Sequence, residues 1–167
     1  FTTDSLANKA YVDQVAQGLD TKPSCRVGTT ANLSATYSNG TAGVGATLTN
    51  SGTQAALTID GVTMVAADRV LVKDQSTAAQ NGIYVVTNIG SGSSNWILTR
   101  ATPEDQPAEL TGGSFVFVEQ GTANGDNGYV FTHNGAPTFG TTALDVAQFS
   151  GAGQITAGAA LTKSGNQ

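Results

Sequence analysis

Short runs of β-branched and aromatic residues, separated by glycine-containing turns, recur along most of this 167-residue chain. The clearest runs cover residues 57–65, 69–73, 82–87, 96–100, 114–119, 129–132 and 148–150. Such residues favour pleated, half-buried strands, and glycine permits the positive φ angles of tight turns. Runs at this spacing are typical of antiparallel sheets and not of parallel sheets with crossover helices. We therefore predict an all-β fold, a small antiparallel β-sandwich or barrel.

The Asp60-Gly61 pair is the sharpest turn signal in the sequence, because it stands between alternating β-formers. A type I′ turn requires positive φ at both central residues, and an Asp-Gly pair meets that need. We predict a hairpin over residues 57–65. Alternation within the other runs predicts a set of mostly buried side chains. The set is Val70, Val72, Ile83, Val85, Ile97, Phe115, Phe117 and Phe131.

Residues 4–19 hold an amphipathic helical pattern, in which Val12, Val15 and Leu19 recur at helical spacing before Pro23 ends it. A helix of this length is marginal in water unless its apolar stripe packs on something. The stripe can pack on the chain's own β-domain, or on copies of itself in a short parallel bundle. We favour the bundle, which gives these three residues a role in assembly.

Two further segments stand apart from the strand pattern. Residues 34–54 are rich in Gly, Thr, Ser and Asn, and they predict a long excursion, a projecting hairpin or arm that carries Tyr37. We expect the arm to contact a neighbouring subunit, with contact to another partner as the alternative. Residues 151–167 lack bulky side chains and read as a connector. The predicted organisation is a helical trimerisation segment (1–22), a β-domain (23–150) and an extended connector (151–167).

The charge of the chain excludes two classes of partner. Only 11% of the residues are charged, the formal net charge is −5, and the seven Lys and Arg residues are scattered. A nucleic-acid binder needs a clustered cationic face, and so does a protein that binds an anionic membrane surface. No apolar run approaches the ~20 residues of a membrane span. We expect neither nucleic-acid binding nor membrane insertion.

The residues that could carry catalysis do not form a recognisable constellation. His133 is the sole histidine, and we expect it at the surface beside a turn. Glu104, Asp105 and Glu109 surround two prolines and predict a solvated loop, although paired carboxylates of this kind serve glycoside hydrolysis. The lone Cys25 is expected to be a small buried apolar residue. We predict that the chain is not an enzyme and uses no cofactor and no metal ion.

Neutral polar and aromatic side chains leave sugar binding open. Tyr37 and Trp96 could stack on a glycan while Thr, Ser and Asn groups form hydrogen bonds to it. Trp96 also opens a strand pattern, which favours a place in the core. Tyr37 and Trp96 are therefore candidate glycan contacts, with core packing as the competing interpretation.

In order along the chain, several segments resemble domains found in tail-fibre and related virion proteins of tailed bacteriophages. They include LANKAYVD (6–13), TIDGV (58–62), DRVLVKDQ (68–75), NGIYVV (81–86), LTRAT (98–102), FVFVE (115–119) and QFSGAGQI (148–155). The resemblance implies a structural module of a homotrimeric tail fibre, located extracellularly in the virion tail. It also implies that the partners are the chain itself and other tail or baseplate proteins; a host cell-surface glycan is left open as a further partner. The alternatives are a receptor module that binds surface polysaccharide and a fragment of a polysaccharide depolymerase.

Overall fold

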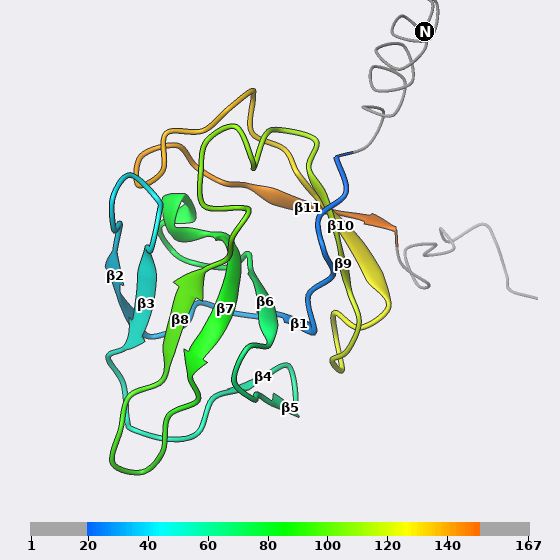
Figure 1. The fold of residues 1–167 in the computed structure, drawn as a ribbon. Helices are drawn as coiled ribbons and strands as arrows, with labels where there is room; N and C mark the ends of the chain where they lie inside the picture. The colour runs from blue at the N-terminus through cyan, green and yellow to red at the C-terminus, as the bar shows by residue number, and fades with distance from the viewer. Residues whose placement is uncertain (1–19, 151–167) are drawn as a thin grey trace, which may run out of the picture.

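The computed structural model describes residues 20–150 (Figure 1). The predicted helix with Val12, Val15 and Leu19 lies outside the described residues, and so does the predicted connector 151–167. Within residues 20–150 the chain is all-β, as predicted, and its strands form sheets without closing into a barrel.

A six-stranded sheet forms the larger part of the fold, in the order β1-β6-β7-β8-β3-β2. Its strands are β1 (Val27–Gly28), β6 (Arg69–Val72), β7 (Gly82–Asn88), β8 (Ile97–Arg100), β3 (Thr47–Asn50) and β2 (Ala35–Ser38). All neighbours are antiparallel except β1 and β6, which pair in parallel. A short 3-10 helix, η2 (Ala78–Gln80), precedes β7. The antiparallel prediction is therefore right for every pair in this sheet but one.

A three-stranded antiparallel sheet has the order β11-β10-β9, with β9 (Phe115–Val118), β10 (Asn127–Phe131) and β11 (Val146–Ser150). The segment before β1 runs parallel to β9, through bridges of Thr21 with Phe115 and of Cys25 with Val118. The next backbone N–H, that of Arg26, already donates to Arg69 in β6. This segment therefore ties the two sheets together within a few residues (Figure 1).

The predicted hairpin at Asp60-Gly61 is confirmed. Strands β4 (Thr58–Ile59) and β5 (Val62–Thr63) pair in antiparallel fashion across it. Asp60 has φ 49° and Gly61 has φ 81°, the two positive angles that a type I′ turn requires.

Two clusters of buried side chains lie on opposite faces of β6 and β7. The inter-sheet core packs the six-stranded sheet against the three-stranded one. Its members are Cys25, Leu71, Ile83, Ala101, Leu110, Val116, Val118, Tyr129, Phe131, Phe139 and Leu144. The second core lies on the other face, under the β4–β5 hairpin. Its members are Val27, Leu48, Leu57, Ile59, Met64, Val70, Val72, Tyr84, Val86, Trp96 and Leu98.

The predicted core set is right in part. Val70, Val72, Ile83 and Phe131 are fully buried, whereas Val85, Ile97 and Phe115 are half-buried. The prediction for Phe117 is wrong, because this side chain is 40% exposed. Every residue of β9 is apolar, so alternation alone cannot choose its inner face. Pairing with β10 turns Val116 and Val118 inward and leaves the phenylalanines on the other face.

The predicted arm at residues 34–54 is a hairpin, but it does not project from the domain. Its strands β2 and β3 form one edge of the six-stranded sheet, because β3 pairs with β8. Leu48 and Ala46 are completely buried. At the other end of the hairpin, the Asn39 amide donates to the carbonyl of Phe139 at 3.1 Å. The hairpin is thus part of the core, and its removal would open the second core.

Candidate functional site

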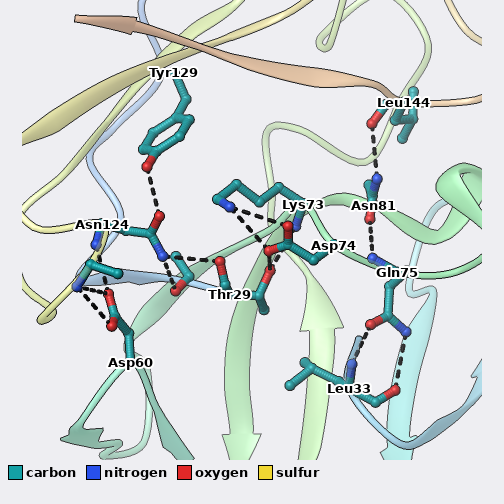
Figure 2. Close-up of polar contacts among 12 residues, drawn as sticks. Thr29, Leu33, Asp60, Lys73, Asp74, Gln75, Asn81, Asn124, Tyr129 and Leu144 are labelled. Atoms are coloured by element: carbon teal, nitrogen blue, oxygen red, sulfur yellow. Dashed lines mark hydrogen bonds and ion pairs between the residues drawn. The ribbon is translucent and has the colours of Figure 1, made fainter. Parts of the chain in front are cut away.

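A group of polar side chains lies where the end of β1, the β4–β5 turn and the loop before β10 meet (Figure 2). We call it the polar junction and define it as Thr29, Asp60, Asp74, Asn124 and Tyr129. Asn124 is 6% exposed and uses both ends of its amide. Its Nδ2 donates to the carbonyls of Gly28 and Thr29 at 3.0 Å each, and its Oδ1 accepts from the Tyr129 hydroxyl at 2.7 Å.

Asp60 attaches the β4–β5 turn to the same loop. Its carboxylate accepts from the backbone N–H of Ala123 at 2.9 Å and from that of Asn124 at 2.8 Å. Its carbonyl accepts from Thr122 N–H at 3.1 Å. An acceptor-only carboxylate suits this position, because consecutive loop N–H groups would otherwise lack partners. The acidic turn residue therefore holds a loop together.

Thr29 links β1 to the end of β6. Its hydroxyl donates to Asp74 Oδ2 at 2.7 Å and accepts from Lys73 N–H at 3.0 Å. The Lys73 ammonium lies 3.1 Å from Asp74 Oδ2 and 5.6 Å from the Tyr129 ring centroid. Burial raises the pKa of Tyr129, and the nearby carboxylates of Asp74 and Asp60 raise it further. Tyr129 is thereby held in its neutral form, which donates to Asn124.

A second chain of hydrogen bonds runs from the segment before β2 to the segment before β11 (Figure 2). The Gln75 amide exchanges two hydrogen bonds with the backbone of Leu33, at 2.7 and 3.3 Å. Gln75 N–H donates to Asn81 Oδ1 at 3.0 Å, and Asn81 Nδ2 donates to the Leu144 carbonyl at 3.2 Å. The side chains of Gln75 and Asn81 therefore connect the segments around Leu33 and Leu144, which do not pair with each other as strands.

The expectation that Glu104 and Asp105 lie in a solvated loop is wrong. Glu104 is 0% exposed and Asp105 is 6% exposed. Glu104 Oε2 lies 3.0 Å from Arg69 Nη2, but the alignment is not that of a hydrogen bond, so the contact is Coulombic. The expectation failed because a buried carboxylate needs a cation, and Arg69 is supplied by a distant strand. Asp105 Oδ2 accepts from Thr102 Oγ1 at 3.1 Å.

Cys25 lies in the inter-sheet core, as predicted, with no exposed surface. Burial raises the pKa of its thiol to about 12, an effect that the Arg69 charge opposes and the Glu104 charge reinforces. A thiol in this state is a packing group and a poor nucleophile, because the thiolate is the reactive form.

Arg100 is a buried cation, at 2% exposure. Its guanidinium donates to the carbonyl of Asn81 at 3.2 Å and to the Tyr84 hydroxyl at 2.9 Å. The guanidinium carbon lies 4.5 Å from the Phe139 ring centroid. A Cβ at Gly82 would lie 2.2 Å from Arg100 Nη1, so the glycine leaves room for the cation. Arg100 therefore connects the end of β8 to the start of β7 through hydrogen bonds.

The predicted glycan contacts lie on one face of the six-stranded sheet, among the side chains of the second core. Trp96 is 7% exposed and belongs to that core, as the competing interpretation held. Tyr37 is half-buried against it, and its hydroxyl donates to Asn39 Oδ1 at 2.7 Å. A glycan contact stays a prediction for both residues.

His133 was expected at the surface and is instead buried, at 9% exposure. Its Nε2 lies 3.1 Å from the Leu110 carbonyl oxygen, and its ring stands nearly edge-on to Phe131. A histidine beside a Gly-containing turn gave no sign of this, because burial depends on the loop that carries Leu110.

Sequence reasoning missed both the polar junction and the second chain of hydrogen bonds. The available signal was that Asp74 of the junction, and Gln75 and Asn81 of the second chain, are polar residues outside the strand alternation. Within residues 20–150, no three His, Cys, Asp or Glu side chains are grouped so that they could hold a metal ion. The same residues include no helix that is long and apolar enough to span a membrane.

Comparisons of the chain with protein-family models, curated proteins and solved structures find no match.

Proposed function

We propose that this chain is a structural module of a homotrimeric bacteriophage tail fibre, which extends or links the fibre outside the cell. The proposal starts from the resemblance of its strand segments to tail-fibre domains. Its partners would be copies of itself and other tail or baseplate proteins.

The polar junction is the observation that carries the proposal. Asp60, Asn124 and Thr29 use their polar atoms on backbone groups and side chains of other segments. Catalytic groups need an open side toward a substrate. Side chains that join separate loops instead resist unfolding, which a structural virion module needs outside the cell.

The low charge of the chain agrees with this role. Buried neutral hydrogen bonds are insensitive to the salt concentration outside the cell, whereas surface ion pairs are screened by it. The single cysteine is buried, so the domain does not depend on the redox state of its surroundings.

The test is the mass of the intact chain in solution, combined with its location in virions. Light scattering should give three times the 16.8 kDa of one chain. Antibodies raised against the chain should label the tails of purified phage particles. A monomer at every concentration, together with unlabelled tails, would refute the proposal.

The purified chain can also be used to test the alternative that this protein is a receptor-binding module. A glycan array that binds the wild-type chain, and loses binding on Tyr37→Ala, would favour a receptor module. Trp96→Ala is unsuitable for this purpose, because the side chain belongs to the second core and its loss would disturb packing.

A further inference from the structure

The three-stranded sheet has one apolar face that the rest of residues 20–150 covers only in part. We call it the aromatic face and define it as Phe115, Phe117, Val130, Ala147 and Phe149. Phe149 is 68% exposed and Phe117 is 40% exposed. Monomeric proteins seldom leave neighbouring large apolar side chains in water, and such patches mark interaction sites.

The register of the sheet brings these side chains together. Phe115 pairs with Val130, and Val130 pairs with Ala147, so the three stand on one face. The ring centroids of Phe115 and Phe149 are 5.9 Å apart with their planes at 85°, although β9 and β11 are not neighbours. Phe117 pairs with Gly128, which has no side chain to cover the ring. The face is thus a preformed apolar surface.

Charge indicates which partner fits this face. The chain carries a net charge of −5, so two copies repel each other at long range. The five side chains of the aromatic face carry no charge, so two copies can meet there without burying like charges. The net charge would attract a basic partner at long range, but such a partner would find no carboxylate among these five side chains to pair with.

The position of the chain ends gives a second reason. The described part begins at Asp20, whose carbonyl accepts from Phe115 N–H at 2.7 Å, and it ends in β11 (Figure 1). Residues 20–25 run parallel to β9 from its Phe115 end, so the described part of the chain both begins and ends beside the aromatic face. Assembly through the stripe that the sequence predicts, which includes Leu19, would therefore bring the aromatic faces of neighbouring copies close to one another.

We infer that the aromatic face is a contact surface between copies of this chain. This inference rests on the proposed function, because it names the surface through which the fibre module assembles. It assigns Phe117 and Phe149 as the central contacts and leaves the six-stranded sheet outside the interface.

The test uses the full chain and the double variant Phe117→Thr/Phe149→Thr, in which threonine keeps the preference for strands. The matched control is Val65→Thr/Ile89→Thr, since these side chains are also 54% and 42% exposed but lie away from the aromatic face. Sedimentation equilibrium should show that the face variant needs an at least about tenfold higher concentration to assemble. The control should assemble like the wild type. Circular dichroism at equal temperature should show that both variants are folded.

A second measurement does not depend on loss of assembly. Cys25 is the sole cysteine and is fully buried, so Phe149→Cys adds one accessible thiol. Under mild oxidation Phe149→Cys should form disulfide-linked copies at a concentration where Val65→Cys does not. Equal cross-linking of the two variants would overturn the inference.

The outcomes separate this inference from the proposed function. A wild-type trimer that the face variant leaves unchanged overturns the inference but not the fibre module. A wild-type dimer that the face variant dissociates supports the inference and refutes the homotrimer. A wild-type monomer without cross-linking overturns both.

Discussion

The two sheets of this domain are covered to different extents. Successive residues of β6 point to opposite cores: Val70 and Val72 to the second core, and Leu71 to the inter-sheet core. In β9 only Val116 and Val118 are buried, and the alternate Phe117 is exposed. Residues 70–72 of β6 and all four residues of β9 are apolar, yet only the stretch in β6 is covered on both faces within residues 20–150.

The difference teaches that consecutive apolar residues in a strand need other groups packed on both faces of the sheet. In β6 the chain provides such packing twice, with the three-stranded sheet on one face and the β4–β5 hairpin on the other. In β9 the chain provides it once. The remaining aromatic face is the place where we propose that another copy completes the packing.

The largest expected effect compares the two sides of the three-stranded sheet. Phe131→Ala removes a fully buried ring from the inter-sheet core and should lower the free energy of unfolding by about 3–5 kcal/mol. Phe117→Ala, on the aromatic face, should cost below about 1 kcal/mol in the monomer. Urea unfolding at a protein concentration too low for assembly measures both. Equal costs would mean that the two faces do not differ in burial.

The next effect tests the ion pair between Arg69 and the buried Glu104. Glu104→Gln should lower the free energy of unfolding by about 3 kcal/mol, because it leaves Arg69 without its buried partner. Arg69→Met/Glu104→Leu should recover most of that loss, since neither charge then remains in the core. Glu109→Gln is the control, as its half-buried carboxylate contacts Gln106 only locally. Thermal unfolding of the four proteins checks the order, which a stable Glu104→Gln protein would contradict.

A smaller effect is expected at the polar junction. Asn124→Ala removes the donors to two carbonyls and the acceptor of the Tyr129 hydroxyl, and should cost about 1–3 kcal/mol. Tyr129→Phe made in the Asn124→Ala background should cost less than the same change in the wild type, because the two side chains share one hydrogen bond. Asn134→Ala, at an exposed position, is the control. Additive costs in urea unfolding would show that the junction does not act as a unit.

The smallest effect concerns the attachment of the first described residues to β9. Burial alone would raise the pKa of Asp20, but hydrogen bonds from Lys22 and Ser114 outweigh it and hold the pKa below its ordinary value. A carboxyl whose pKa is lower in the folded state stabilises the protein above the unfolded pKa, and this contribution is lost as pH falls through the folded value. Asp20→Asn should therefore cost below about 1 kcal/mol near neutral pH, since 43% of the Asp20 side chain is exposed.

The measurement for Asp20→Asn is the difference in melting temperature from the wild type between about pH 6 and pH 2. The difference should shrink as pH falls through the folded pKa of Asp20, because protonation removes the charge that Lys22 and Ser114 stabilise. A difference that is constant over this range would show that the charge of Asp20 does not stabilise the contact with Ser114.

Local chemistry explains which predictions succeeded. Asp60-Gly61 predicts its turn because the required φ angles depend on those two residues alone. The all-β class follows from the frequency of β-formers and glycine, and the burial of Cys25 follows from its apolar character. These properties need no knowledge of what lies opposite in space.

The predictions that failed depended on distant partners. Phe117 was assigned to the core because alternation has no phase in an all-apolar strand, and β10 decides the phase. Glu104 was placed in solvent because its partner Arg69 belongs to another strand. The hairpin at residues 34–54 was expected to project, and its pairing with β8 through β3 could not be foreseen.

The sequence by itself therefore determined the class of fold, the β4–β5 turn and the scarcity of charge, since each is a property of neighbouring residues or of composition. Only the tertiary structure decided which phenylalanines face water, which carboxylate is buried with an arginine, and that Asn124 and Asp60 join separate loops. The physical reason is that burial and hydrogen bonding are relations between residues far apart in the chain, and their energies exist only once the two sheets have packed.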